Sequence, residues 1–128
     1  MGTVLAICIG ASAGALSRWG LGLWLSPGGL IPWGTLAANV LGGYLVGVAI
    51  AVFQAMPHID PVWRLLLVTG FLGGLTTFST FSAEVVTYLL EARYGMAAFT
   101  ALTHVAGSLL MTVAGIKSAS FFIATRAI

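Results

Sequence analysis

Apolar residues fill this chain in four long runs, which three short polar connections separate. A helix that crosses the about 30 Å hydrocarbon core of a bilayer needs about 20 apolar residues, and each run is long enough to supply them. The pattern therefore predicts an all-α membrane protein with four transmembrane helices in a single domain over residues 1–128. The expected helices are Thr3–Leu25, Trp33–Met56, Val62–Leu90 and Met96–Ala124.

The connections contain the proline, glycine and charged residues that interrupt helices. They are predicted at Ser26–Pro32, Pro57–Pro61 and Glu91–Gly95. The first run lacks the basic segment that begins a signal peptide, so we expect it to be a mature helix. The arginine and lysine residues are not concentrated in the connections on one side of the membrane, and this weak bias is compatible with insertion in both orientations.

Composition supports a membrane protein and narrows its chemistry. With 59% hydrophobic and 6% charged residues, the chain cannot cover a soluble globule with polar surface. Five basic residues are too few and too scattered to bind nucleic acid. The single cysteine, Cys8, has no partner in its own chain for a disulfide, and we expect it to be a small buried residue.

Glycine recurs four residues apart, a spacing that lets helix backbones approach closely. The pairs are Gly10 with Gly14, Gly43 with Gly47, and Gly70 with Gly74. Such faces predict helix packing and an oligomer, and they carry no chemistry of their own.

Polar groups at membrane depth are costly and usually face a partner or an aqueous path. Thr35 and Asn39 are four apart and share one helix face, where the amide could donate to an anion or bridge two helices. His104, Ser108 and Thr112 form a similar stripe on the last helix. Their hydroxyls could line an anion track or bond back to their own helix, and His104 is expected to be a satisfied interfacial residue.

The third run contains Gly70–Ser82, in which adjacent glycines precede five hydroxyl residues and two phenylalanines. This composition predicts a broken helix near 73–80, and such a break is tolerated only inside protein or beside a cavity. A break frees carbonyls that suit a small cation and creates a second helix N-terminus that favours anions. Phe78 and Phe81 would share one face, with positive ring edges able to contact an unhydrated anion.

These motifs resemble the Fluc, or CrcB, family of small fluoride channels along essentially the whole chain. The resemblance is carried by Gly10–Trp19, Gly34–Asn39, the Gly73–Phe81 run and Gly107–Thr112. It implies a dual-topology antiparallel homodimer in the bacterial plasma (inner) membrane, with two pores that pass fluoride out of the cell. It implies a structural sodium ion (Na+) and no organic cofactor.

The resemblance also implies roles for individual residues. The fluoride pore would contain Phe78, Phe81, Asn39, Ser108, Thr112, Ser79, Thr80 and Thr35. Glu84 and Arg18 would lie near a pore mouth, and Arg18 could also pair with backbone carbonyls. Main-chain carbonyls of Gly73 and Thr76 from both subunits would bind the sodium ion.

Other functions fit the residues less well. A dual-topology, proton-coupled multidrug exporter would share the length and helix number, but it needs a carboxylate deep in a helix, and Glu84 is the one candidate. A scaffold subunit would leave the third-helix run unexplained. An enzyme is not expected, because no catalytic triad, metal cluster or phosphate loop can be assembled at plausible spacing.

Overall fold

The computed structural model describes residues 2–28 and 32–126, and these are helical except at short connections and one break. The helices are α1 (Gly2–Leu25), α2 (Trp33–Ala55), α3 (Pro61–Arg64), η1 (Leu65–Leu72), α4 (Gly73–Leu75), α5 (Phe78–Leu90) and α6 (Tyr94–Arg126). Taking Pro61–Leu90 as one span, four helices are long and apolar enough to cross a membrane, as predicted. Residues 29–31 of the expected first connection lie outside the described residues.

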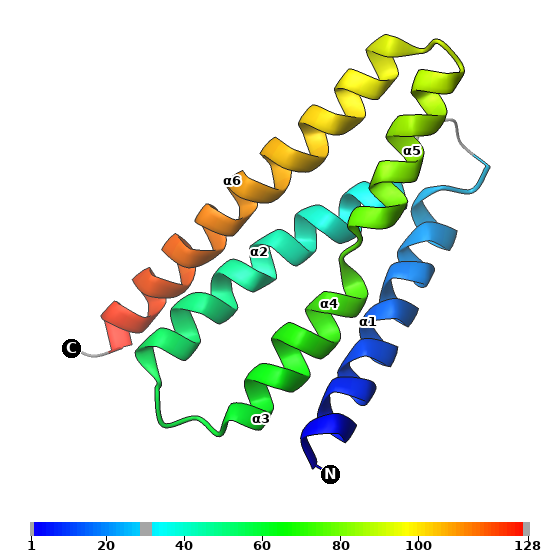
Figure 1. Cartoon of the computed structure of the whole chain (residues 1–128). Helices are drawn as coiled ribbons and strands as arrows, with labels where there is room; N and C mark the ends of the chain where they lie inside the picture. The colour runs from blue at the N-terminus through cyan, green and yellow to red at the C-terminus, as the bar shows by residue number, and fades with distance from the viewer. Residues whose placement is uncertain (1, 29–31, 127–128) are drawn as a thin grey trace.

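The third span changes its packing partner halfway along (Figure 1). Its first half, α3 through α4, lies against α1, whereas α5 packs on α6. The long helices α2 and α6 lie side by side, and α1 also contacts α2. The break between α4 and α5 therefore sits where the two helix pairs meet.

Glycine permits the close approach of these helices. A Cβ added at Gly14 or Gly74 would collide with the backbone of the opposing helix, at Phe71 and Ala11 respectively. The same is true of Gly47 on α2, which faces the carbonyl of Thr112 on α6. The predicted glycine faces are thus helix contacts within one chain.

Replacing Gly47 with alanine is expected to destabilise the fold, because the added methyl group would displace the Thr112 backbone. Overpacking of this kind costs about 1–3 kcal/mol. Thermal unfolding of the purified protein in detergent should show a lower midpoint for this variant. Gly95→Ala is the matched control, since its Cβ would meet nothing within 4 Å. Equal midpoints for the two variants would contradict the packing argument.

Two local features shape the first half of the third span. The Asp60 side chain accepts a hydrogen bond from the N–H of Val62 at 2.9 Å and so caps α3. From Leu65 the chain then winds as a π-helix for eight residues before it returns to α-helix at Gly73. No sequence pattern predicted this π-helical segment, which faces α1.

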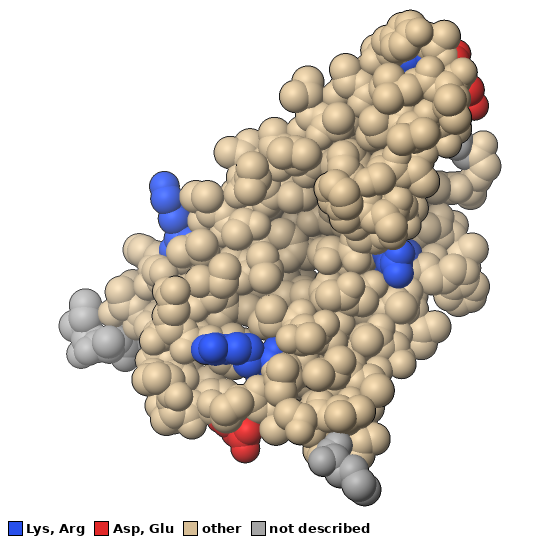
Figure 2. Space-filling view, in the orientation of Figure 1, with Lys and Arg blue, Asp and Glu red and all other residues tan. Residues whose placement is uncertain are grey.

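Few large side chains are buried among the described residues, and many large apolar side chains are exposed. Ala38, Leu72 and Leu75 form the buried core, whereas Trp24 is 77% exposed. Figure 2 shows a face that is largely uncharged, with isolated basic groups. Such a surface suits lipid or another protein chain. Cys8 is also exposed, so the expectation that it is buried was wrong, because a small apolar residue serves equally well on a lipid-facing surface.

Candidate functional site

The break consists of Thr76 and Thr77, both in extended conformation (φ −81°, ψ 154° and φ −150°, ψ 119°). It lies inside the range predicted from the glycine and hydroxyl run. Thr77 caps α5, because its hydroxyl oxygen accepts from the N–H of Thr80 at 3.2 Å. The Thr77 hydroxyl also lies 3.0 Å from that of Thr80 and 3.3 Å from that of Ser79. The predicted pore hydroxyls Ser79 and Thr80 thus gather around the cap.

Thr77→Val is expected to lower stability by about 1 kcal/mol, the usual cost of losing a helix N-cap. Valine has nearly the same shape as threonine, so the change isolates the hydroxyl group. Thermal unfolding in detergent measures the effect, and Thr77→Ser, which keeps the cap, should unfold near the wild-type temperature. A serine variant as unstable as the valine variant would show that the methyl group, and not the cap, matters.

The side chain of Asn39 on α2 fills the break. Its Oδ1 accepts from the N–H of Thr77 at 2.8 Å, and its Nδ2 donates to the carbonyl of Thr77 at 3.0 Å. One amide therefore satisfies both backbone groups of a residue that has left the helix. In a continuous helix the Thr77 N–H would bond to the carbonyl of Gly73, so the break frees that carbonyl.

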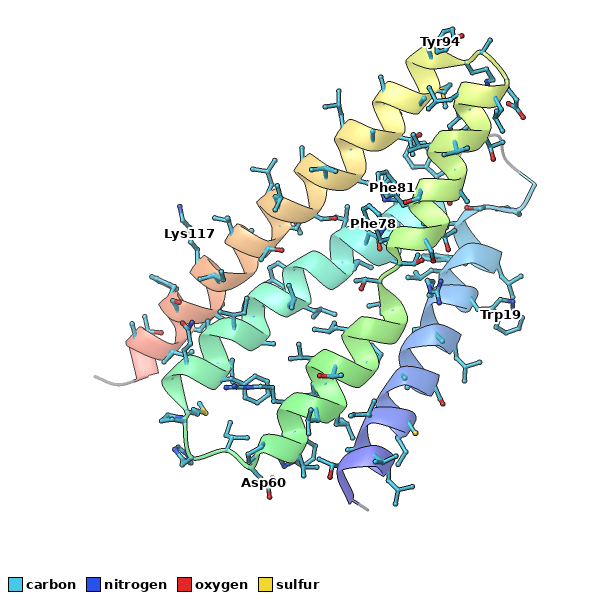
Figure 3. All side chains as sticks on the ribbon, viewed as in Figure 1. Trp19, Asp60, Phe78, Phe81, Tyr94 and Lys117 are labelled. Atoms are coloured by element: carbon cyan, nitrogen blue, oxygen red, sulfur yellow. The ribbon has the colours of Figure 1, made fainter. Side chains whose placement is uncertain are left out.

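Three aromatic rings belong to the site, and two of them, Phe78 and Phe81, lie close together at the start of α5 (Figure 3). Phe78 and Phe81 contact edge to face, with centroids 5.5 Å apart and planes at 64°. The Phe81 ring stacks on the imidazole of His104, from α6, at 4.8 Å and 26°. His104 Nδ1 lies 3.0 Å from Asn39 Nδ2. The two phenylalanines therefore share a face as predicted, and Phe78 is 78% exposed.

His104 is 5% exposed, and its Nδ1 lies 3.0 Å from Asn39 Nδ2, so it is a satisfied residue as expected. Its contacts with Asn39 and Phe81 make it part of the site, which sequence reasoning did not predict. The only signal in the sequence was its place in the stripe with Ser108 and Thr112. Its burial depends on Asn39 and Phe81, which are distant in sequence.

Glu84 approaches the same cluster from α5. Its Oε2 lies 3.9 Å from His104 Nε2 and has no hydrogen-bond partner among the described residues. The carboxyl group also hydrogen-bonds the hydroxyl of Thr35 on α2. Helices α2, α5 and α6 thus each contribute a polar group to the cluster.

A groove of about 380 Å³ opens beside the break. It is lined by Asn39, Gly42, Gly43, Val46, Val68, Leu72, Gly73, Thr76, Thr77, Phe78 and Ser108. We call it the break groove. Phe81, Ser79, Thr80, Thr35 and Thr112 do not line it in the described chain. The Thr112 hydroxyl lies 3.0 Å from the carbonyl of Gly43 and 2.9 Å from that of Ser108, so both bridging and back-bonding occur at this residue.

Arg18 lies on the other side of α4. Its Nε donates to the carbonyl of Gly74 at 3.2 Å, which confirms the expected pairing with a backbone carbonyl. In a continuous helix the N–H of Phe78 would donate to the carbonyl of Gly74, and the Arg18 guanidinium group takes the place of that donor. Among the described residues no cluster of three histidine, cysteine or acidic side chains could hold a metal ion.

Comparison with known proteins gives a consistent result. Residues 5–116 match the family model described as CrcB-like protein, Camphor Resistance (CrcB). The chain is 67% identical over 122 residues to the fluoride-specific ion channel FluC of Albidiferax ferrireducens, covering 95% of this chain and 94% of the relative. It is 69% identical over 115 residues to FluC of Variovorax paradoxus (90% and 92% covered) and 59% identical over 121 residues to FluC of Paracidovorax citrulli (94% and 96% covered).

Proposed function

The chain belongs to the CrcB-like family, and from this premise we propose that it is a fluoride-selective channel that lets fluoride leave the cell passively and so lowers its toxicity in the cytoplasm. The chain is a multi-pass membrane protein, and we place it in the bacterial plasma (inner) membrane. Its relatives are named as ion channels and not as enzymes. The comparisons therefore give no support to the exporter alternative.

The observation that carries this proposal is the meeting of uncharged donors at the break groove. Fluoride is small and strongly hydrated, so a narrow path must replace its water with several donors at once. Asn39 lines the groove with both amide hydrogens bonded, to the Thr77 carbonyl and to His104, and it holds the break in shape. The groups left to meet an anion are the Ser108 hydroxyl and the ring of the exposed Phe78, whose residues also line the groove. These groups attract an anion without a fixed positive charge that would hold it too tightly to pass.

The rest of the path follows the same chemistry. Phe81 supports Phe78 through their edge contact, and Thr112 continues the line of hydroxyls below Ser108 on α6. The hydroxyls of Ser79, Thr80 and Thr35 would complete the lining. We assign Glu84 and Arg18 to the pore mouth, where Arg18 would draw anions inward electrostatically.

A second copy of the chain would complete the site. The exposed Phe78 and the open side of the break groove favour a cover, and lipid tails offer no hydrogen-bonding groups to a polar groove. We propose an antiparallel homodimer of dual topology with two pores, in line with the weak bias of basic residues between loops.

The same dimer would bring two breaks together. Carbonyl oxygens are hard ligands that fit a small cation. The break frees the carbonyl of Gly73, and the carbonyl of Thr76 also leaves the helical direction, because ψ of Thr76 is 154°. We propose that these groups from both subunits hold a structural sodium ion. When bound, sodium would neutralise the converging carbonyl dipoles and stabilise the interface.

Fluoride release from liposomes that contain the purified protein tests the channel proposal. A fluoride electrode should record rapid efflux, and chloride-loaded liposomes should release no chloride. Replacing external and internal sodium with N-methylglucamine tests the sodium proposal, which expects weaker flux or dimer dissociation. Well-folded dimers that pass no fluoride would refute the channel, whereas unchanged flux and dimer without sodium would refute only the ion site.

A further inference from the structure

We propose that His104 is a positioning residue for the fluoride path, held as the neutral tautomer with its proton on Nε2, and that it fixes both the Asn39 amide and the Phe81 ring. The positioning role rests on the proposed function, because it assumes that the chain conducts fluoride. The tautomer itself follows from hydrogen-bond geometry alone.

The first step is the orientation of the Asn39 amide. A backbone N–H can only donate and a carbonyl can only accept. Because Oδ1 faces the Thr77 N–H at 2.8 Å and Nδ2 faces the Thr77 carbonyl at 3.0 Å, a flipped amide would oppose like groups at both contacts. The pairing with Thr77 therefore determines which end of the amide is nitrogen.

The second step fixes the imidazole. The remaining hydrogen of Asn39 Nδ2 faces His104 Nδ1 at 3.0 Å, so Nδ1 must be the acceptor. A neutral imidazole with a free lone pair on Nδ1 carries its proton on Nε2. A doubly protonated ring would instead set two donors against each other at this contact.

The third step concerns the other nitrogen. Nε2 faces the buried Oε2 of Glu84 at 3.9 Å, which is longer than a hydrogen bond but close enough for the N–H to attract a carboxylate oxygen. Glu84 is the titratable group that contacts His104 among the described residues, and it comes from α5. Helix α2 presents the neutral Asn39 to the ring.

The fourth step links the ring to the aromatic pair. The imidazole lies under Phe81 at 4.8 Å, and Phe81 contacts Phe78 at 5.5 Å. Rotation of His104 would therefore displace the face against which Phe81 rests. Since His104 is buried and does not line the break groove, it acts through Asn39 and Phe81 and not by direct contact with the ion.

Nitrogen NMR of isotope-labelled histidine in liposomes tests the tautomer. A His58→Gln background removes the other histidine, so the spectrum reports His104 alone. We expect a protonated Nε2 and an unprotonated Nδ1 in the otherwise wild-type channel. In Asn39→Asp an oxygen would face Nδ1 in place of the amide nitrogen, so Nδ1 should become protonated. A histidine that does not bond to the side chain of residue 39 would not change its protonation site in this way.

Fluoride efflux tests the positioning role. His104→Phe keeps a ring to stack on Phe81 but removes both nitrogens, and we expect its efflux to fall about tenfold while the dimer stays intact. His58→Phe, in the exposed connection between α2 and α3, is the matched control and should keep wild-type flux. A protonated Nδ1 in the wild-type spectrum, or wild-type flux in His104→Phe, would overturn the inference.

The two proposals fail separately. If the wild-type protein passes no fluoride, the channel proposal fails, but the spectrum still decides the tautomer. If the His104→Phe variant does not fold, the wild-type spectrum and its change in Asn39→Asp decide the inference without it.

Discussion

Replacement of Asn39 with aspartate is expected to reduce fluoride efflux about a hundredfold. The carboxylate keeps the acceptor for the Thr77 N–H but sets an oxygen against the Thr77 carbonyl, and the His104 proton moves to Nδ1 to bond the new oxygen. The lost hydrogen bond to the Thr77 carbonyl costs about 1–3 kcal/mol, and a hundredfold fall corresponds to about 2.7 kcal/mol. A negative charge beside the break groove would also repel the anion.

The measurement is efflux from liposomes with equal amounts of folded protein, as judged by size-exclusion chromatography. Gln54→Glu is the matched control, because it makes the same change from amide to carboxylate at an exposed position on α2. Its flux should remain near wild type. If both variants pass fluoride at the wild-type rate, the Asn39 amide has no part in conduction.

Phe81→Ile is expected to lower fluoride efflux about tenfold. The change removes the ring that stacks on His104 and supports Phe78, and aromatic contacts of this kind contribute about 0.5–1.5 kcal/mol each beyond their buried area. Isoleucine keeps an apolar side chain at the position, so the helix should form. The variant therefore loses the contact that orients Phe78 and the positive edge of the Phe81 ring itself.

The control for this variant is Phe121→Ile. Phe121 and Phe122 form a similar edge contact, with centroids 6.0 Å apart, near the end of α6. Phe121 is exposed and lies outside the break groove, so its loss should not change flux. Equal reductions in the two variants would point to a general effect on the bilayer or on folding.

The sequence was sufficient to predict the helices and the position of the break. Long apolar runs predict transmembrane helices because a chain in the bilayer must satisfy its own backbone hydrogen bonds. Adjacent glycines followed by hydroxyl residues have low helix propensity, and the helix is broken just after them. The contact of Phe78 with Phe81 followed from helical spacing. The pairing of Asn39 with Thr77 did not, since the amide could equally have bridged two helices.

Other features depend on tertiary contacts that no local pattern reports. His104 is buried because α2 and α5 bring Asn39 and Phe81 to it. Cys8 could lie inside or outside, because apolar residues are favourable in either place in a membrane protein. The π-helical turns of η1 lie against α1, and their residues would suit an ordinary helix equally well.

The π-helix has a consequence for how this span tolerates changes in length. A π-helical stretch holds more residues per turn than an α-helix, so it can be regarded as an inserted residue absorbed without breaking the rod. Deleting one residue between Leu65 and Leu72 would let the segment return to α-helical winding with little rotation of the residues beyond it. Gly74 would then stay opposite Ala11, and Thr77 beside Asn39. The π-helix therefore preserves the phase of the break, and a single deletion should be better accepted here than in the α-helical spans.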